Sequence, residues 1–142
     1  MAPGRRKSLN GQLKPGRFYW YNCTGKRKMK QIESYSFGNM VYEGKSYTSD
    51  LIIYPDRVDP SWWRLKGHLL QPEDLKEILA ENPGILIIGT GAMGVMNVPA
   101  PLKKQLEDKG IELYVEKTGK AVKIFNAAAQ GKKVIAAFHL TC

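Results

Sequence analysis

The sequence predicts a single compact α/β domain with a mixed, mostly parallel sheet covered by helices and an N-terminal β-hairpin. Three observations support this prediction. Residues 85–88 are four consecutive aliphatic side chains, a run that is typical of a strand buried on both faces. From residue 72 to residue 138 helical and strand patterns alternate, and single helices between strands imply right-handed crossovers in a parallel sheet. The length of 142 residues is that of one domain with one core.

Positive charge is concentrated at the N-terminus. Residues 1–30 contain nine lysines or arginines and no acid, whereas residues 31–142 are balanced, so the net charge of +9 comes from the start of the chain. Glycines and prolines interrupt residues 1–28, and we expect them to form a basic, disordered leader before a domain over 29–142. The four aromatic residues 18–21 could stack bases or lie on the domain. We expect any nucleic-acid affinity to be weak, salt-dependent and lost with the leader.

The first strands of the domain follow the leader. Residues 32–37 alternate apolar and polar side chains, and residues 40–42 and 46–48 flank a glycine-containing hairpin turn. The second arm of this hairpin is expected to continue to Tyr54, where Pro55 ends it. Asp50 lies inside this arm, directly before its most apolar stretch. A carboxylate there is either exposed at an edge or paired with a specific partner.

An irregular segment over residues 56–70 carries two adjacent tryptophans, Trp62 and Trp63, followed by His68. The indoles either cap the core or form the wall of a pocket, and their N–H groups need acceptors. His68 is interpreted as a structural or surface histidine because no second histidine or cysteine stands beside it at metal-ligand spacing.

The second half alternates regularly between helices and strands. Proline and acids open the first helix, a leucine and isoleucine stripe follows, and Pro83-Gly84 ends it. The expected elements are a helix from Pro72, a strand over 85–88, a helix from about Pro101 to Gly110, a strand over 111–115, a helix capped by Thr118 and closed by Gly131, and a strand over 134–138.

Gly89, Gly91 and Gly94 follow the central strand with the spacing of a dinucleotide-binding loop, and an acid, Glu116, lies about 20 residues further on. Pyrophosphate binding requires the helix to begin within this loop. Two prolines, at positions 99 and 101, place the helix start beyond it, which argues against a dinucleotide.

A different small molecule or anion could still bind this loop, because ligands bind at the carboxyl ends of parallel strands. Thr90 either orients a ligand oxygen or bonds its own backbone, and His139 ends another strand at the same edge.

Four short motifs resemble the MTH-domain family, whose members include the animal adipogenesis-associated MTH-domain protein and a mitochondrial complex I assembly factor. The motifs are Tyr47–Asp50, Trp62–Arg64 with Gly67-His68, Ile88–Gly91 and His139–Cys142. The resemblance covers residues 31–142 and implies a compact α/β domain without an established enzymatic activity. The shared positions of the family correspond here to Asp50, Trp62, His68, Gly89, Thr90, Gly91, Gly94, Asn126 and His139.

The sequence therefore predicts a non-enzymatic interaction or assembly domain with a protein partner. The alternative is a small-molecule or anion site, with or without catalysis, at the Gly89–Gly94 loop. Its candidate residues are Gly89, Thr90, Gly91, Gly94, Asp50, Trp62, His68 and His139. We predict no cofactor, metal, specific nucleic acid or membrane contact, and we assign no catalytic residue or oligomeric state. Two cysteines make no disulfide framework, which favours the cytoplasm.

Overall fold

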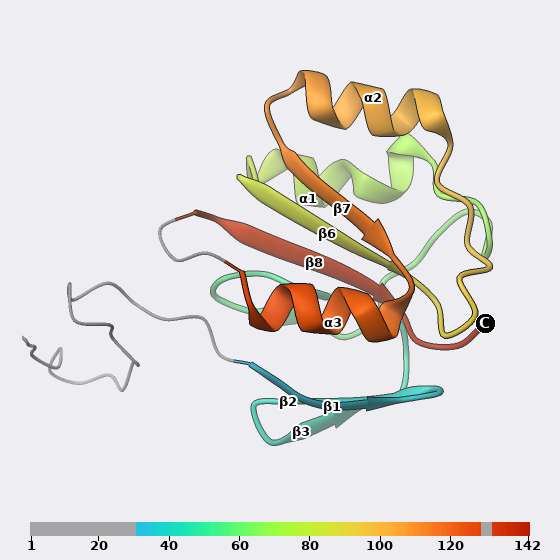
Figure 1. Cartoon of the computed structure of the whole chain (residues 1–142), viewed down its shortest axis with the longest axis vertical. Coiled ribbons are helices and arrows are strands. Elements are labelled where there is room, and N and C mark those ends of the chain that lie inside the picture. Colours follow the sequence, from blue (N-terminus) through green and yellow to red (C-terminus); the bar gives the residue numbers. More distant parts are fainter. Residues whose placement is uncertain (1–30, 129–131) are drawn as a thin grey trace, which may run out of the picture. The chain divides into compact units, whose positions relative to one another are not determined.

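The structure is a computed structural model that describes residues 31–128 and 132–142. The expected leader lies outside the described residues, and so does Gly131, the residue expected to close the last helix. Two β-sheets and three α-helices make up the described part (Figure 1). The α/β fold class with a mixed sheet is confirmed.

The larger sheet has five strands in the order β5-β4-β8-β6-β7. Their bounds are β4 Leu51–Ile53, β5 Val58–Asp59, β6 Ile85–Thr90, β7 Glu112–Glu116 and β8 Val134–His139. Strand β6 pairs in parallel with β7 and β8, whereas β4 is antiparallel to β8 and to the short strand β5. Every residue of β6 and β8 is buried, as the aliphatic run predicts.

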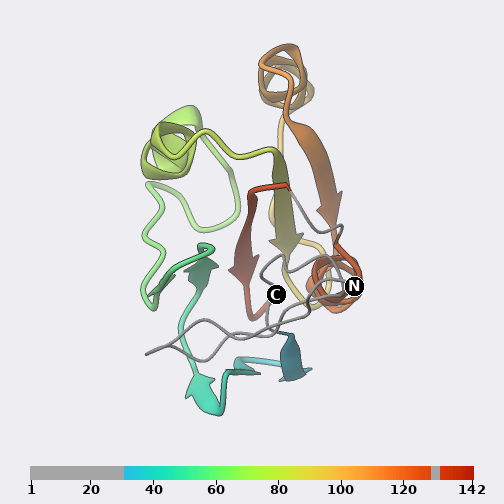
Figure 2. The same cartoon turned by 90° about the vertical axis from the view of Figure 1, so that its left-hand side faces the viewer.

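Helices pack on both faces of this sheet (Figure 2). The 3₁₀ turn η1 Pro72–Leu75 continues into α1 Lys76–Ala80, and α2 Ala100–Asp108 follows β6. Their apolar side chains form one core with Leu86 and Ile88, which are alternate residues of β6. On the other face lies α3 Thr118–Asn126, whose Phe125 ring meets the Phe138 ring of β8 edge-on at 6.3 Å.

The smaller sheet is antiparallel and comprises β1 Ile32–Ser36, β2 Asn39–Tyr42 and β3 Lys45–Tyr47. It packs against α3. The Tyr42 ring contacts Phe125 edge-on at 6.1 Å. Asn126 holds both polar groups of the Ile32 backbone, accepting from its N–H at 2.7 Å and donating to its carbonyl at 3.1 Å. This anchors the N-terminal strands to the helix.

One expectation for this region is wrong. The second hairpin arm does not continue to Tyr54, because β3 ends at Tyr47 and β4 belongs to the other sheet. The reason is burial. All three residues of β4 are buried and pair with β8 in the core, whereas the first two residues of β3 are exposed. The chain changes sheets between the two strands, at the segment that carries Asp50.

The expected helix cap is also wrong. Thr118 is the first residue of α3, and its side chain caps nothing. It is fully buried, and its hydroxyl instead donates to the His139 carbonyl at 2.6 Å and accepts from the Gly91 N–H at 2.9 Å. Tertiary partners therefore replace the local cap. Helix α3 also ends at Asn126, earlier than expected.

Candidate functional site

The register between β4 and β8 brings the first two site residues together. Leu51 pairs with Phe138 in antiparallel fashion, so the residue before one lies opposite the residue after the other. These are Asp50 and His139, and their Oδ2 and Nδ1 atoms are 2.8 Å apart. The Leu140 N–H donates to the other Asp50 oxygen at 2.8 Å. Asp50 is thus paired with specific partners, one of the two outcomes that its position predicts.

Arg64 completes what we call the Asp–His–Arg cluster, made of Asp50, Arg64 and His139. Its Nη2 donates to Asp50 Oδ2 at 2.7 Å, and its Nη2 and Nε both donate to the Gly67 carbonyl. The guanidinium stacks over the Trp62 ring at 4.6 Å. Only 5% of the Arg64 side chain is exposed. A charge buried this far needs its carboxylate partner.

The hydrogen bonds define the protonation of the cluster. Burial raises the pKa of Asp50, but the hydrogen bonds from His139, the Leu140 N–H and Arg64, with the charge of Arg64, outweigh it and lower the pKa to about 2. The carboxylate is ionised at neutral pH and can only accept. His139 therefore carries its proton on Nδ1. The 3.3 Å approach of Arg64 Nη2 to Nδ1 joins two donors and is not a hydrogen bond.

Two buried nitrogens of this cluster have no hydrogen-bond partner within the described part of the chain, His139 Nε2 and Arg64 Nη1. Leaving a buried polar atom unpaired costs about 1–3 kcal/mol. The exposed His68 lies next to them, with its ring edge-on to the His139 ring at 5.8 Å. Its backbone carbonyl accepts from the Asn97 N–H at 2.8 Å, which fixes the loop that carries it.

The glycine loop follows β6 and is in contact with the last residues of the sequence. The N–H of Ala92 donates to the Thr141 carbonyl at 2.8 Å, and those of Met93 and Val95 donate to the Cys142 oxygen at 3.0 and 3.2 Å. Gly91 has φ +106°, and a Cβ atom there would lie 2.6 Å from the Thr141 oxygen. This glycine is needed for the close approach of residues 141–142.

The other predicted residues of the loop pack against the start of α3. A Cβ atom on Gly89 would lie 2.8 Å from Thr118 Oγ1, and one on Gly94 would lie 3.0 Å from Lys117 Cγ. Thr90 donates to the Glu116 carbonyl at 3.1 Å, so its hydroxyl bonds backbone. Helix α2 begins at Ala100, beyond the loop. The structure thus places the glycines in one group, and Asp50, Trp62, His68 and His139 around Arg64 in another.

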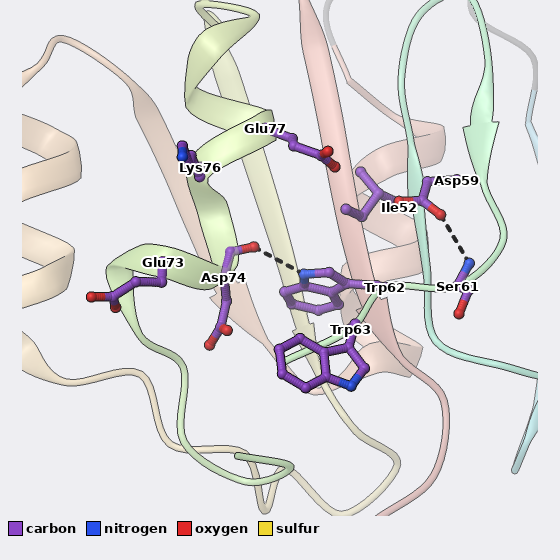
Figure 3. A pocket seen from close by; sticks show the side chains of 9 residues that line it. All are labelled: Ile52, Asp59, Ser61, Trp62, Trp63, Glu73, Asp74, Lys76 and Glu77. Atoms are coloured by element: carbon purple, nitrogen blue, oxygen red, sulfur yellow. Dashed lines mark hydrogen bonds between the residues drawn. The ribbon is translucent and has the colours of Figure 1, made fainter. Parts of the chain in front are cut away.

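Both tryptophans line a surface cavity of about 280 Å³, which we call the tryptophan groove (Figure 3). Trp62 is buried and donates its indole N–H to the Asp74 carbonyl at 3.1 Å. Trp63 is 72% exposed. The remaining lining residues are mostly charged: Ile52, Asp59, Ser61, Glu73, Asp74, Lys76 and Glu77.

The groove carries four carboxylates and one ammonium group. Asp74 is occupied, because its two oxygens accept the N–H groups of Leu65 and Gln71. The side chains of Glu73 and Glu77 form no ion pair or hydrogen bond with any described residue, so their charges face the solvent. An exposed indole beside free carboxylates is chemically suited to a cation.

Sequence reasoning missed Arg64 and the acidic lining of the groove. Arg64 directly follows the tryptophan pair, and an arginine beside buried aromatics was the available signal, since guanidinium groups stack on such rings. The carboxylates come from β5 and from η1 and α1, so no local pattern groups them. Over residues 31–128 and 132–142 there is no cluster of three metal-ligating side chains, and no helix is long and apolar enough to cross a membrane.

Comparison with known proteins gives the family. A family described as "Protein of unknown function (DUF498/DUF598)" matches residues 32–139. The chain belongs to this family. A conserved hypothetical protein of Pyrococcus horikoshii is 30% identical, with a TM-score of 0.66 over 79% of this chain and 99% of that one. An outer membrane protein of Bartonella henselae is 26% identical, with a TM-score of 0.66 over 80% and 97%.

A third solved structure, a Mth938-like domain of Bordetella pertussis, is 17% identical, with a TM-score of 0.54 over 78% of this chain and 85% of that one, and shows the shared fold. The resemblance to the MTH-domain family is thereby confirmed. The family is one of unknown function, so the site must be argued from its own chemistry.

Proposed function

We propose that this protein is a non-enzymatic interaction domain that binds a cationic segment of a protein partner in the tryptophan groove. One observation carries the proposal: the largely exposed indole of Trp63 lies at a cavity whose lining has four carboxylates and one lysine. A lysine or arginine side chain entering the groove would lie over the indole face and reach Glu73 and Glu77. We also propose a cytoplasmic location, supported by the low cysteine content.

The fold supports a preformed groove. Trp62 forms its floor and is fixed by hydrogen bonds from its indole N–H to Asp74 and from its backbone N–H to the Asp50 carbonyl. Asp74 is itself fixed by two backbone donors. A rigid site loses little conformational entropy on binding. Trp63 and the two free glutamates are then the adjustable contacts.

The alternative at the Gly89–Gly94 loop has less support. An anion would need the loop amides, but those of Ala92, Met93 and Val95 already donate to the oxygens of residues 141 and 142. A ligand would have to displace this segment before it could use them. The glycines are accounted for by close packing.

The test is the affinity of a fluorescently labelled lysine- and arginine-rich peptide, measured by anisotropy with the full chain. The measurement is made at physiological ionic strength. The Debye length of about 8 Å under this condition screens the effect of the overall +9 charge on binding, whereas contacts at shorter range are retained. Each opposite charge at about 4 Å contributes about 1 kcal/mol in water. We therefore expect Glu73→Gln/Glu77→Gln to weaken binding about tenfold or more, and Trp63→Ala about threefold.

The matched control is Glu33→Gln/Glu107→Gln, which changes the net charge equally at two exposed positions outside the groove. Affinity should be unchanged in this variant. Equal weakening in both double variants would mean that the peptide follows net charge alone, and the proposal would be wrong. The same conclusion follows if Trp63→Ala binds as well as the wild type.

A further inference from the structure

We propose that the Asp–His–Arg cluster is a binding site for a small carboxylate. In the bound state Arg64 Nη1 donates to one carboxylate oxygen, and protonated His139 Nε2 donates to the other. The starting observation is that both nitrogens are buried without a partner among the residues described, on side chains that are only 5% and 7% exposed. Buried polar atoms in folded proteins are nearly always paired, and the described residues supply no partner for these two.

The guanidinium of Arg64 and the ring of His139 are held side by side by the same carboxylate oxygen. Arg64 Nη2 and His139 Nδ1, on the same guanidinium and the same ring, are 3.3 Å apart and are both held by Asp50 Oδ2. The Asp50 carboxylate orients both side chains and leaves Nη1 and Nε2 as the free positions. A planar group with two oxygens can meet two neighbouring donors at once.

Charge selects the ligand class. Asp50 and Arg64 cancel, so with a neutral His139 the cluster has no net charge. A carboxylate brings one negative charge, and one proton taken from solvent onto Nε2 restores neutrality. A phosphate dianion would need a second proton or leave a buried charge uncompensated, which is strongly unfavourable. A buried site that gains one positive charge by taking up one proton therefore fits a monocarboxylate.

Access to the cluster runs past His68. This ring is exposed and lies edge-on to the His139 ring, and an exposed side chain can change rotamer without movement of the backbone. The other charged or titratable groups around His139 are Asp50, Arg64 and Tyr35, whose hydroxyl donates to the Leu140 carbonyl at 2.8 Å. Tyr35 stays neutral near pH 7, because burial and the Asp50 charge raise its pKa.

The test uses acetate with the full, wild-type chain, followed by ¹⁵N NMR of the histidine ring nitrogens. We expect a saturable shift of His139 Nε2 towards the protonated value. Calorimetry in two buffers of different ionisation enthalpy should show uptake of one proton. Over the pH range in which binding takes up one proton, the dissociation constant should rise about tenfold per pH unit.

Two comparisons make the result decisive. Arg64→Met should abolish acetate binding, whereas Arg57→Met should not, although Arg57 also stacks on an aromatic ring, that of Tyr54, at 4.0 Å. Acetamide should bind more weakly and without a proton. If the Nε2 signal of the folded wild type does not respond to acetate, the site holds water only and the proposal is overturned. Equal binding of acetamide, or no proton uptake, would also overturn it.

Discussion

Replacing Asp50 by asparagine tests the central ion pair of the domain. The asparagine oxygen can still accept the Leu140 N–H, but its amide group then faces two donors, Arg64 Nη2 and His139 Nδ1. The charge of Arg64 would be left buried without compensation. Asp50 itself is 18% exposed, so water relieves part of this penalty.

The magnitude follows from two independent arguments. The fall of the Asp50 pKa from 3.8 to about 2 corresponds to about 2 kcal/mol of stabilisation. Removing one partner of a buried ion pair costs about 3–5 kcal/mol, and the partial exposure of Asp50 places this site at the lower end. We therefore expect Asp50→Asn to lower the free energy of unfolding by about 2–4 kcal/mol at pH 7. Urea unfolding followed by tryptophan fluorescence measures it.

The pH dependence has a definite sign. The folded pKa lies below the unfolded value, so the stabilisation by Asp50 is complete above pH 3.8 and is lost as the pH falls towards about 2. The difference between wild type and Asp50→Asn should narrow over that window. Asp56→Asn is the control, because Asp56 pairs with Arg57 at the surface with 69% of its side chain exposed. An Asp50→Asn effect no larger than that of Asp56→Asn, or a difference that does not change with pH, would refute the reasoning.

Three other substitutions have clear expected outcomes. Gly91→Ala forces a methyl group against residues 141–142 and should lower the melting temperature severely, whereas Gly44→Ala, with φ +76° and open space, should cost only about 1–2 kcal/mol. Thr118→Val leaves a buried N–H and a buried carbonyl without their hydroxyl partner, so urea unfolding should show a loss of about 2–4 kcal/mol. Asn126→Ala should accelerate amide hydrogen exchange in β1 more than in β6, because it removes both bonds that hold β1 to α3.

Much of the fold could be predicted because its determinants are local. The run over 85–88 indicates a buried strand, and Pro101 indicates where α2 begins. Local reasoning failed where tertiary burial overrides it. Thr118 has a typical capping residue type, yet its buried hydroxyl is engaged by two distant backbone groups. The three apolar residues of β4 resemble a continuation of the hairpin, but only the core explains why they join the other sheet.

The candidate site could be predicted only in part for the same reason. The position of Asp50 before an apolar strand requires a partner, but that partner lies 89 residues away and depends on the β4–β8 register. Gly91 was predicted as a ligand-binding residue because its loop follows the carboxyl end of a parallel strand. Its role in the structure is steric, and it depends on where residues 141–142 pass. Neither the pairing of Asp50 with His139 nor the approach of residues 141–142 to Gly91 can be inferred from the spacing of residues in the sequence.

Trp62 belongs to both proposed sites and connects them physically. One face of its ring is stacked by the Arg64 guanidinium, while its N–H bonds Asp74 and its ring forms the floor of the tryptophan groove. A carboxylate bound to Arg64 would act on a guanidinium whose position is set by that stacking. If carboxylate binding shifts the Trp62 ring, it changes the shape of the groove and therefore the affinity for a cationic segment. By linkage, a cationic segment in the groove would then change the affinity for the carboxylate by the same factor. Peptide affinity measured with and without acetate therefore determines whether the two sites are independent or coupled.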